Sequence, residues 1–291
     1  VFGGGDGDGQ GAAGTVHSST VLLKDGVRIL RGENGNEMAA HGGFDHIDVA
    51  FMVHGSTLTQ LETPSLALIE MDVEFHGKTA HAGIAPYAGR SAVDAVTMLQ
   101  TGLGLMRNHL KDSSRVSNIV LAGGTAVNSV PDFAKVKVEI RHSSMAYLES
   151  VEQWTREIAQ AAAMATQTQV KITPVAHIYN TTINDAMGAL LMECAEKFAC
   201  DGIAPPRKDC GSTDFGAVTH RLPSCCLRVK TIETDDPPHT DAWVKTGKEA
   251  RAHQGIYDGA VCCALAAFRL VTDEAAWQDV YQCFLAHQKE N

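Results

Sequence analysis

The stretch that decides the fold begins with LALIEMDVEF at residues 66–75. Its second half alternates, with Met71, Val73 and Phe75 on one side of the chain and acidic residues between them. This pattern predicts a β-strand with one buried and one solvated face. Apolar residues then recur at helical spacing across residues 91–110. The stretch therefore opens with a strand followed by an amphipathic helix.

Further elements of the same kind continue to residue 178. Two strand patterns, a second amphipathic helix pattern and a last strand pattern lie at residues 117–122, 134–141, 147–166 and 169–177. The order strand, helix, strand, strand, helix, strand is that of a ferredoxin-like antiparallel sheet with two helices on one face. We therefore expect a ferredoxin-like α+β domain over residues 67–180.

The sequence on both sides of this domain predicts a second, discontinuous domain. The run IDVAFMVHG at residues 47–55 is apolar up to His54, as in a buried strand. Helix patterns follow the inserted domain at residues 185–199, 250–268 and 273–288. The fold class is therefore α/β, with one domain formed by residues 27–66 and 181–291. The glycine-rich residues 1–26 are expected to be loop or disordered.

Composition limits the class of partner. The net charge of −10 argues against a nucleic-acid surface, which needs clustered basic residues. We see no apolar run near the ~20 residues of a membrane span, so no membrane partner is expected. The eight cysteines include vicinal pairs in apolar sequence and show no CxxC spacing. They are interpreted as buried thiols, which favours a reducing, cytoplasmic location.

Polar side chains at the ends of the predicted elements are candidates for chemistry. His54 ends a buried strand, where an imidazole needs a specific partner such as a metal ion. His239 lies in DDPPHTDAW, whose prolines stiffen the loop that would hold a second ligand. An ordinary loop histidine would give the same pattern. Asp214, in GSTDF, could orient a ligand or could cap the following helix.

A second group of candidates lies in the ferredoxin-like domain. His81 is in the loop HGKTAHAG after the first strand, where it is exposed enough to reach a ligand. Asn128, in AVNSVPD, and Arg141, at a strand end, form the kind of pair that binds a carboxylate. The alternatives remain an Asx turn for Asn128 and a solvated edge residue for Arg141.

Together these strings resemble metallopeptidase family 20, the zinc-dependent aminoacylase, carnosinase and amidohydrolase enzymes. Within that family the sequence is most similar to dipeptidase-like members and aminobenzoyl-glutamate hydrolases. The resemblance covers about residue 32 to the C-terminus. It rests on FDHIDVAFMVHG, EFHGKTAHAGIAPYAGRSAVDAV, GGTAVNSVPDFAKVKVEIR, ATQTQV, GSTDFG and PPHTDAW.

The resemblance implies a division of roles between the two domains. His54 and His239 match metal ligands of a catalytic site that holds two zinc ions in complete family members, and Asp214 supports them. The inserted domain matches the family's lid and dimerisation domain, which implies a homodimer. His81 matches the lid histidine that reaches into the partner subunit's site and polarises the scissile carbonyl. Asn128 and Arg141 match the lid pair that binds the carboxylate of the substrate.

The sequence also departs from the family pattern. The family's His-x-Asp, its bridging Asp or Cys-x-His and its Gly-Thr-Pro-Ala-Glu-Glu do not occur. Glu33, in RGENGNE, lies nearest to where the glutamates belong and is the candidate general base. Two likely ligands fall short of the three protein ligands of a catalytic zinc, so we interpret the catalytic domain as partial and expect an upstream segment to be lost.

The resemblance implies hydrolysis of an amide or peptide bond in a small substrate with a free carboxylate. Such a substrate is a dipeptide or an N-acyl amino acid. Because the metal site is incomplete in this sequence, we expect the activity to be impaired in this chain. The alternative is a non-catalytic dimerising or regulatory protein that keeps the lid but not the metal site.

Overall fold

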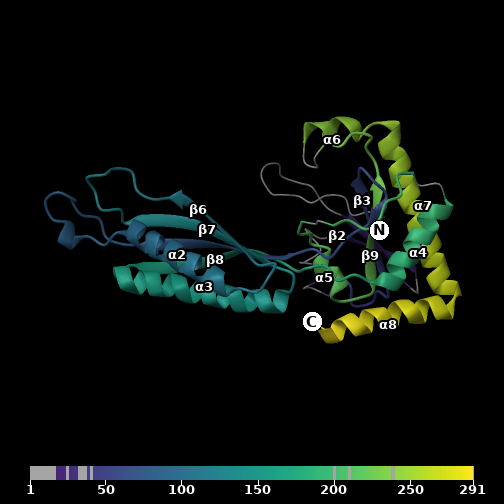
Figure 1. Ribbon diagram of the computed structural model, residues 1–291, viewed down its shortest axis with the longest axis horizontal. Helices are drawn as coiled ribbons and strands as arrows, with labels where there is room; N and C mark the ends of the chain where they lie inside the picture. Colours follow the sequence, from purple (N-terminus) through teal and green to yellow (C-terminus); the bar gives the residue numbers. More distant parts are fainter. Residues whose placement is uncertain are drawn as a thin grey trace. The chain divides into compact units, whose positions relative to one another are not determined.

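The computed structural model describes residues 18–23, 26–31, 38–39, 42–198, 201–208, 211–236 and 240–290. The chain forms two compact units (Figure 1). Unit 1 comprises Val1–Ser65 and Thr181–Asn291, and unit 2 comprises Leu66–Asn180. Unit 2 is thus an insertion within unit 1.

Unit 2 is the ferredoxin-like domain expected from the sequence. Its elements are β5 (Ala67–His76), α2 (Ala92–Met106), β6 (Arg115–Ala122), β7 (Phe133–His142), α3 (Met145–Thr166) and β8 (Gln169–Ile178). The strands pair in the order β6-β7-β5-β8, and each pairing is antiparallel. Short 3-10 turns at Pro86–Ala88 (η1) and Arg107–His109 (η2) flank α2.

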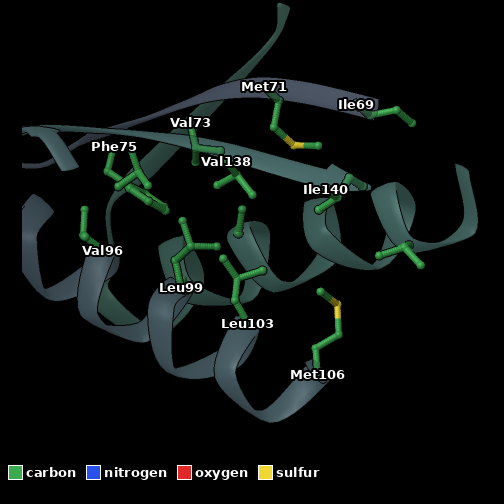
Figure 2. Close-up of a cluster of buried hydrophobic side chains, with 14 of the residues drawn as sticks. Ile69, Met71, Val73, Phe75, Val96, Leu99, Leu103, Met106, Val138 and Ile140 are labelled. Atoms are coloured by element: carbon green, nitrogen blue, oxygen red, sulfur yellow. The ribbon is translucent and has the colours of Figure 1, made fainter. Parts of the chain in front are cut away.

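The apolar alternation of the central strands builds the core of unit 2. Met71, Val73 and Phe75 on β5 are fully buried, and so are the alternate apolar residues of β7. Figure 2 shows these side chains facing Leu99 and Leu103 of α2. Burying one such side chain contributes about 1.5–3 kcal/mol. The opposite face of the sheet is polar because the residues between them are charged.

Local signals set the starts of the two helices of unit 2. The Ser91 side chain accepts a hydrogen bond from the backbone N–H of Asp94 and so caps α2. The Ser144 side chain caps α3 in the same way, through the N–H of Tyr147. A serine at this position satisfies an N–H group that otherwise has no partner within the helix. Both helices therefore begin at residues that the sequence marks.

Unit 1 contains a small mixed sheet and several helices. The sheet has the order β3-β9-β4, from β3 (Ala50–Ser56), β9 (Ser224–Lys230) and β4 (Gln60–Leu61). The helices are α4 (Asp185–Lys197), α5 (Gly216–Thr219), α6 (Asp241–Thr246), α7 (Ala250–Thr272) and α8 (Glu274–Glu290). The strand β3 runs parallel to β9, and β4 runs antiparallel to it.

Two glycines bring helix α7 close to the unit 1 sheet. A Cβ atom at Gly255 would lie 2.6 Å from the backbone oxygen of Lys230, and one at Gly259 would lie 2.5 Å from Cγ1 of Val53. Of the described helices, α7 alone is long and apolar enough to cross a membrane by length and composition. Its buried stripe packs in the core of unit 1 with residues of β3 and β9, as in a core helix of a globular protein.

Two residues hold the ends of the insertion together. The backbone N–H of Ser65 donates to Oγ1 of Thr181 at 2.6 Å, and the N–H of Thr181 donates to Oγ of Ser65 at 2.8 Å. Both residues are buried. This reciprocal pair, the Ser65–Thr181 clasp, lies where the chain leaves unit 1 and returns to it.

The structure corrects the sequence expectations in two places. The sequence predicts loop or disorder for residues 18–23, but they form β1 (Ser18–Leu23), which pairs with β2 (Gly26–Arg31). The β-branched residues in SSTVLL favour this strand. The strand β9 was not predicted, since SCCLRVK lacks alternation. Its Cys225 and Cys226 are buried thiols, as expected, and burial raises the pKa of Cys225 to about 12.

Candidate functional site

The loop of His81 and the turn of Asn128 lie together at one end of the unit 2 sheet. The loop follows β5 and the turn precedes β7, and because these strands are antiparallel neighbours, both segments emerge at the same end. The N–H of Ala82 donates to the backbone oxygen of Asn128 at 2.9 Å, and His81 forms a β-bridge with Ser129. Both His81 and Asn128 are exposed. We call this end of unit 2 the tip.

The hydrogen bond on the His81 ring sets its tautomer. Nδ1 of His81 accepts a hydrogen bond from the backbone N–H of Gly83 at 3.2 Å. A neutral imidazole that accepts at Nδ1 carries its proton on Nε2. His81 therefore presents an N–H donor at the tip, which is the chemistry needed to polarise a carbonyl oxygen.

Arg141 lies near the other end of the same sheet. It is eight residues beyond Phe133, the first residue of β7, which corresponds to about 26 Å of extended strand. Its guanidinium binds both carboxylate oxygens of Glu139, with Nε at 2.8 Å and Nη2 at 3.1 Å. Within one chain the structure therefore brings His81 and Asn128 together and leaves Arg141 apart from them.

His54 lies on β3 of unit 1, directly opposite Arg228 of β9. Nη1 of Arg228 is 3.0 Å from Nδ1 of His54, and the backbone oxygen of Gly55 is 2.6 Å from the same nitrogen. Nε of Arg228 donates to the buried carboxylate of Glu62. Arg207 contacts the other oxygen of that carboxylate at 3.6 Å. No sequence signal pointed to Arg228, because its position depends on the pairing of two distant strands.

The other predicted residues are placed only in part. Asp214 is partly buried in the loop before α5, and its backbone oxygen accepts from the N–H of Ala217. No side chain caps α5 at its N-cap residue, Phe215. The expected metal ligand His239 and the candidate base Glu33 lie outside the described residues.

The described residues do not fit a zinc site. No group of three or more His, Cys, Asp or Glu side chains among them is arranged to hold a metal ion. The one predicted ligand that the structure describes, His54, has a guanidinium cation against its ring. A catalytic zinc needs three protein ligands, and a neighbouring cation opposes the binding of another cation.

Known proteins resemble this chain in sequence and fold. Residues 67–167 match the family model of a peptidase dimerisation domain. The chain is 28% identical to Xaa-Arg dipeptidase of Mus musculus over 86% of its own length and 58% of that protein. It is 26% identical to a p-aminobenzoyl-glutamate hydrolase chain of Escherichia coli over 86% of its own length and 65% of that protein. It thus spans less than two thirds of either relative.

A solved structure agrees with the fold. Aminobenzoyl-glutamate utilization protein from Klebsiella pneumoniae superimposes with a TM-score of 0.62 at 22% identity, over 84% of this chain and 61% of that one. The two sequence relatives are named as a dipeptidase and an amide hydrolase. The chain is a relative of the metallopeptidase family 20 enzymes, and unit 2 is their peptidase dimerisation domain.

Proposed function

We propose that this chain carries the carbonyl-polarising and carboxylate-binding groups of a hydrolase for dipeptides or N-acyl amino acids. The observation that carries the proposal is the fixed Nε2–H donor of His81 at the tip, beside the Asn128 turn. This donor stabilises the oxyanion that develops when the amide carbonyl is attacked. Arg141 binds the substrate carboxylate in the bidentate manner that it now shows with Glu139.

One substrate reaches both ends of the sheet only if two copies of the chain supply them. A dipeptide spans about 7 Å, far less than the roughly 26 Å of strand between the tip and Arg141. The substrate therefore meets His81 and Asn128 of one copy and Arg141 of another. This requirement supports the homodimer that the dimerisation domain suggests.

The edge strand β6 is suited to join the two copies. It pairs on one side only among the described strands, and it exposes Ile119, Val120 and Leu121. An exposed apolar edge is a template for pairing with another strand. If β6 pairs antiparallel with its copy across a two-fold axis, the Arg115 end of one strand lies beside the Ala122 end of the other. The Arg141 end of one sheet then lies beside the tip of its partner.

Mixing two variants tests this arrangement through binding, without the need for turnover. His81→Ala and Arg141→Ala are each expected to lose binding of a non-hydrolysable dipeptide analogue, measured by calorimetry. When the two are refolded together, half of the dimers are mixed, and each mixed dimer has one intact site. Binding should then return to roughly a quarter of the wild-type sites. No recovery in verified mixed dimers would refute a site shared between copies.

We also propose that this polypeptide by itself hydrolyses such substrates weakly or not at all. The support is the lack of a three-ligand group among the described residues. Zinc in a complete family site would supply an activated water. Turnover of β-alanyl and acyl dipeptides by the purified chain, lost on chelation, would contradict this proposal.

The second candidate function is a non-catalytic dimerising or regulatory protein. The specific observation in its favour is the Arg228 guanidinium against His54, at a position where the resemblance implies a metal ligand. Stoichiometric zinc in the purified protein would exclude this candidate. The described cysteines are thiols rather than disulfides, which supports a reducing compartment such as the cytoplasm.

A further inference from the structure

The strand end at His54 carries a network of its own. The Arg228 side chain is only 12% exposed and lies between the ring of His54 and the carboxylate of Glu62, whose own exposure is 5%. The strand β4 places Gln60 opposite Arg228 and so brings Glu62, two residues later, to this part of the sheet. Arg228 is therefore held from both sides.

The contacts of Nδ1 of His54 describe a competition. This nitrogen lies 2.6 Å from the backbone oxygen of Gly55 and 3.0 Å from Nη1 of Arg228. In a neutral ring it carries either a proton, which it donates to Gly55, or a lone pair, which accepts from Arg228. An arginine side chain only donates, so it cannot share a proton that Nδ1 already carries. The two contacts belong to different tautomers of His54.

The tautomer decides what the ring can bind. When Nδ1 donates to Gly55, Nε2 keeps a lone pair and is able to bind a metal ion, as ligating histidines commonly do. When Nδ1 accepts from Arg228, Nε2 carries the proton and presents no lone pair. A hydrogen bond from an ionised donor is roughly twice as strong as one between neutral groups, which favours the second tautomer.

We propose that Arg228 is a positioning residue that holds His54 in the Nε2-protonated tautomer and so keeps it from binding a divalent metal ion. Its guanidinium charge acts in the same direction, because it lies beside the ring to which a dication would bind. The buried carboxylate of Glu62 makes this arrangement stable by neutralising Arg228. The inference is independent of the substrate-binding groups of unit 2.

Nitrogen-15 NMR of the imidazole rings tests the tautomer directly. The His54 signals are assigned by their loss in His54→Gln. In the wild type, Nε2 is expected to show the shift of a protonated ring nitrogen and Nδ1 that of an acceptor. In the double variant Arg228→Met with Glu62→Gln, which removes both charges and leaves no uncompensated ion, the two shifts should exchange. A wild-type ring protonated on Nδ1 would overturn the proposal.

Zinc alone, titrated into the same samples, gives a second measurement. The wild-type His54 signals should stay unchanged over a range in which those of the double variant shift. Removing Arg228 is expected to raise the zinc affinity at His54 by about 10- to 100-fold. The matched control is Arg207→Met, which removes the other arginine on Glu62 but not the contact with His54, and it should behave like the wild type. Equal zinc responses in all three proteins would also overturn the proposal.

Discussion

Leu103→Ala is expected to destabilise unit 2 far more than the same change two residues further along the same helix. Leu103 is fully buried against the sheet, whereas Leu105 is 66% exposed. A buried Leu→Ala change leaves a cavity and costs 2–5 kcal/mol, so we expect about 3 kcal/mol for Leu103. An exposed substitution away from such features stays within about 0.5 kcal/mol. Because both changes are Leu→Ala in α2, helix propensity cancels between them.

Tryptophan fluorescence during urea unfolding measures this difference. Trp154, on α3, is the one tryptophan of unit 2, so all variants are made with Trp243→Phe and Trp277→Phe. With an m-value of about 1.5 kcal/mol per M, Leu103→Ala should lower the midpoint by about 2 M. Leu105→Ala should leave it nearly unchanged. All samples are compared at one protein concentration, because dimerisation shifts apparent stability. Equal midpoint shifts for the two variants would refute the core described for unit 2.

Three further outcomes follow from the structure. Gly255→Ala places a Cβ 2.6 Å from the backbone oxygen of Lys230, so we expect unit 1 to lose about 1–3 kcal/mol, seen as a lower melting temperature by circular dichroism. The hydrogen bond from Lys135 lowers the pKa of Glu74 below its ordinary 4.5, so Glu74 stabilises unit 2 above pH 4.5 and loses that effect as pH falls through its lowered pKa. Urea midpoints measured from pH 6 to pH 3 should therefore fall less steeply in Lys135→Met than in the wild type. The Cys225 thiol, with a pKa of about 12, has a thiolate fraction of only about 10⁻⁴ at pH 8 and should resist alkylation until the protein unfolds, as mass spectrometry would show.

The sequence predicted unit 2 well because its signals are local. Alternation at Met71, Val73 and Phe75 fixes which face of β5 is buried, and the two serine caps lie next to the helices that they start. Each signal needs only a few neighbouring residues. The order of these elements then allows few topologies, and the observed one is the ferredoxin-like arrangement.

The site was less predictable because it depends on pairing between distant segments. Arg228 contacts His54 only because β3 and β9 pair in one particular register, although 174 residues separate them. Asn128 and Arg141 are close in sequence, but the first precedes β7 and the second lies near its far end. Short sequence spacing thus concealed a long distance. Only the strand register shows which side chains meet.

The Ser65–Thr181 clasp has a consequence for how such proteins change during evolution. Because the two ends of the insertion are already tied to each other by buried hydrogen bonds in unit 1, the host domain experiences unit 2 as a single long surface loop. The entropy of closing a loop grows only with the logarithm of its length. Exchanging the whole inserted module for another, or for a short linker, therefore costs the host little, provided that residues 65 and 181 keep side chains able to form the clasp.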